Sequence, residues 1–172
     1  MVNVNEFLTE SNAIEDVHTE SALGDSFDAW AYLRQQSNLT HGVLQTAHEH
    51  ILKHRQPNIA GHYRDIDVQI GGRRPPPPEF VELAMGELLE WQPMDPVRAV
   101  EWHVAFERIH PFADGNGRIG RLVYLWHCLE HLNSEPILWR AADREGYYAV
   151  FDSEVTVPEP TGNETDSSVT HE

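Results

Sequence analysis

The chain has 172 residues, with 28 acidic side chains against 12 basic ones and a formal net charge of −16 at pH 7. Such an acidic surface opposes binding to nucleic-acid phosphates, and the sequence shows neither a signal segment nor an apolar run long enough to span a bilayer. We therefore expect one compact cytoplasmic domain with no nucleic-acid or membrane partner.

Seven segments carry apolar side chains at three- and four-residue spacing, which is typical of amphipathic helices. The first segment begins with Asn3 and Glu6 placed as a capping pair. Helices are expected near 5–18, 25–36, 39–54, 78–91, 95–109, 117–132 and 142–151. Strand evidence is limited to Val68 and Ile70, which alternate with polar residues before Gly71-Gly72. The predicted fold is therefore mostly α, a helical bundle with a short β-hairpin flap.

The chain divides into three parts by composition. Residues 1–20 hold the first helix, and residues 21–151 hold the core with the remaining helices. Residues 152–172 are acidic and rich in Ser, Thr and Pro, without lysine or arginine. That composition predicts a disordered tail.

The string His110-Pro111-Phe112-Ala113-Asp114-Gly115-Asn116-Gly117-Arg118-Ile119-Gly120-Arg121 concentrates chemistry at the start of the sixth helix. Gly115, Asn116 and Gly117 form a turn whose backbone N–H groups can face an anion at a helix N-terminus. His110 can accept a proton near neutral pH, and Asp114 is a hard oxygen ligand suited to Mg²⁺.

Arg118 and Arg121 lie one turn apart in the first turns of this helix. Positive charge there opposes the helix dipole, so an anionic ligand would relieve the cost. Taken singly, each element of the string has an ordinary explanation as a turn, a helix end or a surface ion pair. Their combination favours a site that binds phosphates and activates a hydroxyl.

The string resembles the signature of the Fic family, His-Pro-Phe-x-(Asp/Glu)-Gly-Asn-(Gly/Lys)-Arg-x-x-Arg. Most members with glycine after the asparagine transfer AMP from ATP to a protein hydroxyl, whereas the Doc branch has lysine there and phosphorylates. Gly117 therefore implies a protein adenylyltransferase acting on a Tyr, Thr or Ser of a target protein or of itself.

The resemblance also assigns roles to the residues of the string. His110 would deprotonate the target hydroxyl, and Asp114 would bind Mg²⁺ or Mn²⁺. Gly115, Asn116 and Gly117 would hold the nucleotide's anionic part. Arg118 would hold the β- and γ-phosphates of ATP and Arg121 the γ-phosphate.

Further segments are similar to the family. Gly61-His62-Tyr63-Arg64 resembles its lead-in to a target-docking flap, here Val68, Gln69, Ile70, Gly71 and Gly72. The open edge of such a strand could pair with a target segment by strand addition. Residues 144–148 resemble the Arg-x-x-Tyr-Tyr of the last core helix. The flap is shorter than usual before Pro75.

Residues 11–16 resemble the family's inhibitory motif, (Ser/Thr)-x-x-x-Glu-(Gly/Asn), in the N-terminal class. Ser11 and Glu15 lie one turn apart, and Asp16 replaces the expected Gly or Asn. The resemblance implies that Glu15 pairs with Arg121 and prevents productive binding of the γ-phosphate. A carboxylate and a guanidinium can form two parallel hydrogen bonds. The same glutamate could assist removal of AMP, and relatives often form homodimers.

Two other function classes stay open on the sequence alone. The chain could be a nucleotide-binding regulatory or antitoxin-like module with little turnover, or a kinase-type phosphotransferase. The pairs His50/His54 and His127/His131 have the i, i+4 spacing of zinc ligands, but helix-surface histidines are the simpler interpretation.

Overall fold

The computed structural model describes residues 2–152, and the predicted tail lies outside them apart from its first residue. Seven α-helices account for most of this range. They are α1 (Val4–Ile14), α2 (Glu20–Leu33), α3 (His41–Leu52), α4 (Pro78–Glu90), α5 (Pro96–Ile109), α6 (Asn116–Trp126) and α7 (Arg144–Ala149). Each sequence-predicted helix is present, so the mostly helical fold class is confirmed.

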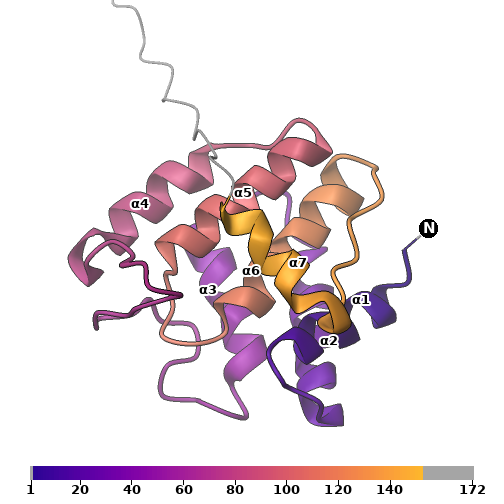
Figure 1. The fold of residues 1–172 in the computed structure, drawn as a ribbon, viewed down its shortest axis with the longest axis horizontal. Helices are drawn as coiled ribbons and strands as arrows, with labels where there is room; N and C mark the ends of the chain where they lie inside the picture. The colour runs from indigo at the N-terminus through magenta and orange to yellow at the C-terminus, as the bar shows by residue number, and fades with distance from the viewer. Residues whose placement is uncertain (1, 153–172) are drawn as a thin grey trace, which may run out of the picture.

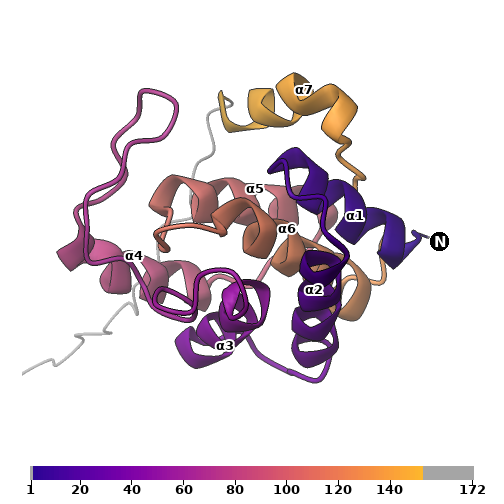
Figure 2. The same cartoon turned by 90° about the horizontal axis from the view of Figure 1, so that it is seen from below.

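Helix α6 lies at the centre of the bundle, with α5, α3, α2 and α1 packed around it (Figures 1 and 2). Its hydrophobic side chains are almost completely buried, and so are its two arginines. A helix that is buried all round must be enclosed by its neighbours. The start of α6 is therefore held in place from several directions.

The C-terminal end of α6 continues as a π-helix, His127–His131. There His127 is buried against the rings of Trp102 and Trp126, whereas His131 is exposed. The expectation that both are surface histidines is therefore wrong for His127. Burial lowers the pKa of His127 to about 3, so it is neutral. No cluster of three or more potential metal-ligating side chains occurs within residues 2–152.

Most helix boundaries differ from the predicted ones by a few residues, and two of the differences have a clear local cause. Helix α1 ends at Ile14, because Asp16 takes a left-handed conformation with φ 55°. Helix α2 begins at Glu20, where the Thr19 side chain accepts a hydrogen bond from the Ala22 N–H. Three-ten turns flank α7 at Ala141–Asp143 and Val150–Asp152.

The flap between α3 and α4 projects beyond the helices (Figure 2). Strand pairing within its hairpin is one antiparallel bridge between Ile70 and Arg73, closed by two backbone hydrogen bonds of 3.0 and 2.8 Å, while Tyr63 nearer α3 forms a separate bridge with Phe112. Gly71 and Gly72 between them both have positive φ, as a type I′ turn requires. The prolines that follow cannot donate backbone hydrogen bonds, which keeps the hairpin to this one bridge.

No helix within the described range is both long and apolar enough to cross a bilayer.

Candidate active site

His110 ends helix α5 in a left-handed conformation with φ 49°. This is a strained backbone for a residue other than glycine, and such strain is often kept where function needs a fixed direction. The His110 N–H still donates to the Phe106 carbonyl oxygen at 2.9 Å, and Pro111 then prevents the helix from continuing. The sequence thus turns the histidine out of the helix at a defined angle.

Arg64 ties this turn to the base of the flap. Its Nε donates to the His110 carbonyl oxygen at 2.8 Å, and its guanidinium also donates to the carbonyl oxygens of Ile66, Pro76 and Ile109. Only 4% of Arg64 is exposed. The family-like Gly-x-Tyr-Arg segment therefore fixes the histidine loop and the flap relative to each other.

The turn after Asp114 leaves the N-terminus of α6 without a side-chain cap. Gly115 is the N-cap residue with φ 80°, a conformation that suits glycine. The Asn116 side chain bonds the backbone N–H and carbonyl oxygen of Phe112, at 2.9 and 2.8 Å, and so closes the loop. The sequence places Asn116 in an anion-binding turn; here its side chain shapes the loop. The first backbone N–H groups of α6 are the groups suited to an anion.

His48 of α3 packs against the turn at Asp114 and Gly115. This role was not predicted from the sequence. The Gly61 N–H donates to its Nδ1 at 3.0 Å, so Nε2 donates to the Asp114 carbonyl oxygen at 2.9 Å. Its ring stacks on Phe112 with a centroid separation of 3.7 Å. Burial lowers the pKa of His48 to about 4. Its position on the apolar face of the predicted 39–54 helix was the sequence feature that could have indicated a buried histidine.

Arg118 is a buried cation with an incomplete set of partners. It is 5% exposed, and its Nε has no hydrogen-bond partner among the described residues. An ion pair of 3.7 Å joins it to Asp114, and burial lowers its pKa although that carboxylate acts in the opposite direction. Buried donors normally find acceptors. The arrangement therefore suits an anionic ligand beside Arg118.

Asp114 could hold a divalent metal ion together with phosphates. Its side chain is 48% exposed, and it accepts hydrogen bonds from Gln56 and from the Gly115 N–H. Mg²⁺ commonly takes one or two carboxylates and fills its remaining positions with substrate phosphates and water. One accessible carboxylate beside a phosphate-suited helix start fits that pattern.

Arg121 is buried, 1% exposed, and donates four hydrogen bonds to residues of α1 and α7. Its Nε and one terminal nitrogen bond the Ser11 hydroxyl and carbonyl oxygens, and the same nitrogen bonds Glu15 Oε1 at 2.8 Å. The remaining nitrogen donates to the Tyr147 hydroxyl. Glu15 thus meets Arg121 through one nitrogen rather than through two parallel bonds, because Nε bonds Ser11 and the other terminal nitrogen bonds Tyr147.

The network continues from Tyr147 into α5. The Tyr147 hydroxyl lies 3.0 Å from His103 Nε2, and burial lowers the pKa of His103 to about 3. A neutral His103 can accept a hydrogen bond from the Tyr147 hydroxyl, while the oxygen of that hydroxyl accepts a hydrogen bond from Arg121. Burial alone would lower the pKa of Arg121, but Tyr147 and Glu15 raise it overall. The sequence indicated Tyr147 only through the Arg-x-x-Tyr-Tyr resemblance and gave no role to His103.

The end of α1 explains the aspartate in the inhibitory-like motif. The Asp16 N–H donates to Ala13 and the Val17 N–H to Asn12, the two hydrogen bonds of a Schellman helix end. Position 16 therefore needs a left-handed residue, a conformation that Gly and Asn favour and Asp tolerates. Asp16 also pairs with the Arg144 guanidinium at 2.8 and 3.2 Å. That pairing lowers the pKa of Asp16.

Glu15 lies directly against the backbone of Gly117. A β-carbon on Gly117 would overlap Glu15 Oε1 and would lie 2.9 Å from a terminal nitrogen of Arg121. Only glycine at this position lets the carboxylate reach the arginine. The glycine of the anion-binding turn thus also leaves the space that the Glu15 carboxylate occupies.

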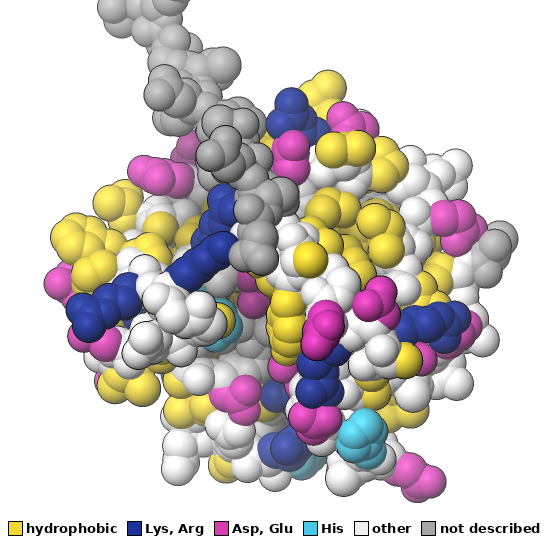
Figure 3. Space-filling model, viewed as in Figure 1, with side chains coloured by type: hydrophobic (Ala, Val, Ile, Leu, Met, Phe, Trp, Pro, Cys, Tyr) yellow, Lys and Arg dark blue, Asp and Glu magenta, His cyan; other side chains and the backbone are white. Residues whose placement is uncertain are grey.

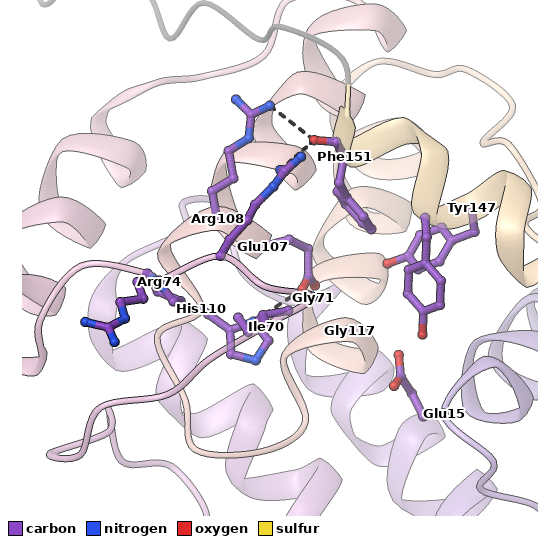
Figure 4. A pocket seen from close by; sticks show the side chains of 13 residues that line it. Glu15, Ile70, Gly71, Arg74, Glu107, Arg108, His110, Gly117, Tyr147 and Phe151 are labelled. Carbon is purple, nitrogen blue, oxygen red and sulfur yellow. Dashed lines mark hydrogen bonds and ion pairs between the residues drawn. The ribbon is translucent and has the colours of Figure 1, made fainter.

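Four of these residues, Glu15, His110, Gly117 and Tyr147, border a cavity of about 700 Å³, whereas Asp114, Arg118 and Arg121 are not among its lining residues. Figure 3 shows it as a hollow with a histidine in it and arginine side chains along its border. Glu15, His110 and Gly117 line it together with Ile70 and Gly71 of the flap, as Figure 4 shows from close by. The flap residues Val68, Gln69 and Gly72 do not line it. The predicted base, the predicted inhibitory glutamate and part of the predicted flap therefore meet at one cavity.

Comparison with known proteins agrees with this geometry. The family model described as Fic/DOC family matches residues 38–128. The chain is 31% identical over 123 residues to a protein adenylyltransferase Fic of Nematostella vectensis, which covers 67% of this chain and 29% of the relative. It is 33% identical over 112 residues to a protein of the same name from Culex quinquefasciatus, covering 61% and 22%. The chain thus spans less than a third of either relative.

Two solved structures share the fold. A Fic domain containing signaling protein from Bacteroides thetaiotaomicron superposes with a TM-score of 0.73 at 21% identity, covering 86% of this chain and 70% of that one. Fic-1 from C. elegans, residues 134–508, gives 0.73 at 19% identity, covering 85% and 53%. With the family match over more than half of its length, the chain belongs to the Fic/DOC family.

Proposed function

We propose that the protein transfers AMP from ATP to a hydroxyl side chain of a target protein or of itself. The observation that carries this proposal is that His110 and Gly117, which lies at the uncapped start of α6, line one cavity. The next residue, Arg118, is a buried cation whose Nε has no hydrogen-bond partner among the described residues. A module that only bound nucleotide would not need a base there. The curated relatives named protein adenylyltransferase support the same reaction class.

The chemistry follows from these groups. His110 accepts the proton of the target hydroxyl, whose oxygen forms a bond to the α-phosphorus of ATP. The bond from that phosphorus to the bridging oxygen breaks, and pyrophosphate leaves. The N–H groups of α6 and Arg118 stabilise charge on the phosphates. A Mg²⁺ or Mn²⁺ ion bound by Asp114 would neutralise charge on the leaving pyrophosphate.

We further propose that the form described here is inhibited. Arg121 is the residue that the family resemblance assigns to the γ-phosphate, and each of its three nitrogens already donates to Ser11, Glu15 or Tyr147. ATP would have to displace Glu15 before its γ-phosphate could reach this guanidinium. Release of α1, or loss of the Glu15 carboxylate, would therefore activate the protein.

The test uses ATP labelled at the α- or the γ-phosphate, with Glu15→Gly as the active form. Covalent α-label on protein is the expected result, and it should be lost in the Glu15→Gly/His110→Ala double variant. Covalent γ-label would show a kinase instead. Bound but untransferred ATP, with a panel of cell proteins also present, would overturn the enzyme proposal and favour a regulatory binding module.

Removal of AMP is the second activity that the site could support. Glu15 and His110 line the same cavity, so a water molecule could be oriented by the carboxylate where the target hydroxyl would otherwise lie. Protein modified by the Glu15→Gly variant should then lose AMP when wild-type chain is added. If the wild-type chain does not remove AMP, Glu15 has only the inhibitory role.

A further inference from the structure

Glu107 lies one helical turn before His110 on α5, and its carboxylate faces the histidine ring. Glu107 Oε2 is 3.6 Å from His110 Nδ1, and the two side chains are 12% and 20% exposed. Among the described residues, neither Nδ1 of His110 nor Oε1 of Glu107 has a hydrogen-bond partner. Figure 4 shows the Glu107 carboxylate beside the His110 ring.

Gly120 on α6 leaves the space that this carboxylate occupies. A β-carbon on Gly120 would lie 2.8 Å from Glu107 Oε1 and 2.9 Å from His103 Nδ1. Glu107 helps to raise the pKa of Arg121, yet its Oε1 has no hydrogen-bond donor among the described residues. Because a buried carboxylate without a donor is costly, its position beside the histidine needs a reason. The packing of α5 on α6 thus keeps a negative charge next to one nitrogen of the ring.

We propose that Glu107 is a positioning residue that holds His110 with its proton on Nδ1. The Nδ1–H then donates toward Glu107, and the lone pair of Nε2 is left to face the cavity. When the target oxygen bonds to the α-phosphorus and pyrophosphate leaves, the hydroxyl proton moves to Nε2. The ring becomes an imidazolium whose charge Glu107 offsets; Glu107 itself takes no proton.

The first experiment reads the histidine directly and needs no turnover. ¹⁵N chemical shifts of the imidazole nitrogens distinguish the Nδ1–H from the Nε2–H tautomer, and the His110→Ala spectrum assigns the signals. Wild type and Glu107→Gln should show the Nδ1–H form, because an amide oxygen can still accept. Glu107→Ala should show a mixture. An Nε2–H form in the wild type, or no change in Glu107→Ala, would overturn the proposal.

The second experiment separates orientation from charge, and it rests on the proposed AMP transfer. In the Glu15→Gly background, Glu107→Gln should lower kcat about 10- to 100-fold, as expected when a charge-assisted hydrogen bond to the imidazolium is replaced by a neutral one. The KM for ATP should stay the same, because Glu107 is not placed on the phosphates. Glu101→Gln is the matched control, since it removes a carboxylate of the same helix that pairs with Arg98.

The two arms fail differently. Absence of AMP transfer in every variant would sink the proposed function and leave the tautomer measurement valid. An unchanged kcat in Glu107→Gln, beside an active parent, would refute the role of the Glu107 charge. Because Gln has nearly the shape of Glu, this variant keeps the test available even if Glu107→Ala does not fold.

Discussion

The two arginines of the motif lie one turn apart on α6, yet their surroundings differ. Arg121 gives hydrogen bonds to two other helices and has a buried tyrosine ring 4.9 Å away. Arg118 is nearly as buried, but within residues 2–152 its Nε has no hydrogen-bond partner and its one ion pair is long. One end of the proposed phosphate site is therefore filled by the protein itself, and the other end is prepared for an anion. Inhibition of this kind needs to block only one of two cations.

The largest expected difference is in stability. Arg121→Ala should lower the free energy of unfolding by about 3 kcal/mol, because it leaves Glu15, Ser11 and Tyr147 without their common partner. Arg118→Ala should cost less than about 1 kcal/mol, since it removes a buried charge that is poorly compensated. Urea denaturation of both variants measures the difference. Equal losses would show that the two cations contribute alike to the fold.

Acid should weaken both ends of the site through their buried histidines. The folded-state pKa values of His48 and His103, about 4 and about 3, lie below the ordinary 6.5. The unfolded chain therefore binds protons that the folded chain does not, and stability falls as the pH falls from 6.5 toward 4. Each histidine contributes about 1.4 kcal/mol per pH unit well below 6.5.

Thermal melts between pH 7 and pH 4.5 test this prediction. His48→Gln and His103→Gln should each reduce the slope of stability against pH, whereas replacement of the exposed His131 should not. A slope that is the same in all three variants would contradict it.

ATP affinity measures how far Arg121 is blocked. Glu15→Gly should bind a non-hydrolysable ATP analogue about 10- to 100-fold more tightly, the range expected when one charge-assisted hydrogen bond no longer competes. Isothermal titration calorimetry gives the affinities, with Glu20→Gln, an exposed carboxylate at the start of α2, as the control. Identical affinities for Glu15→Gly and wild type would mean that Arg121 is not contested.

The smallest effect is expected at Asp16. Asp16→Asn keeps a residue that tolerates the left-handed conformation but removes the charge that pairs with Arg144. AMP transfer should rise by less than in Glu15→Gly. The rise should be larger at low salt, because the Asp16–Arg144 ion pair that the variant removes is screened least there. The pKa of Asp16 is lowered, so its contribution is present above the ordinary 3.8 and is lost as the pH falls through the lowered value. Activity equal to wild type at low salt would show that the Arg144 pair does not hold α1.

The elements with strong local patterns could be predicted from the sequence. Helix periodicity located all seven helices, and the motif placed His110, Gly117 and Arg121 near one another because they share a loop and the helix after it. The meeting of Glu15 with Arg121 came from family resemblance, since nothing local brings position 15 to position 121. The position of His48 on an apolar helix face indicates burial but not its partners, and the contacts of His103 likewise depend on packing between helices. The spacing of Glu107 and His110 can be seen in the sequence, but the burial of Glu107 against Gly120 of α6 cannot.

Gly117 has a consequence for how this protein could change. Its missing side chain leaves room for Glu15, and its backbone belongs to the turn proposed to receive the nucleotide. Any substitution at this position would expel the glutamate and reshape the phosphate-binding turn in the same step. A substitution at position 117 could therefore not change inhibition by Glu15 without also changing the rate of AMP transfer. Graded regulation would have to arise elsewhere, in the contacts by which Arg144 of α7 holds the C-terminal end of α1.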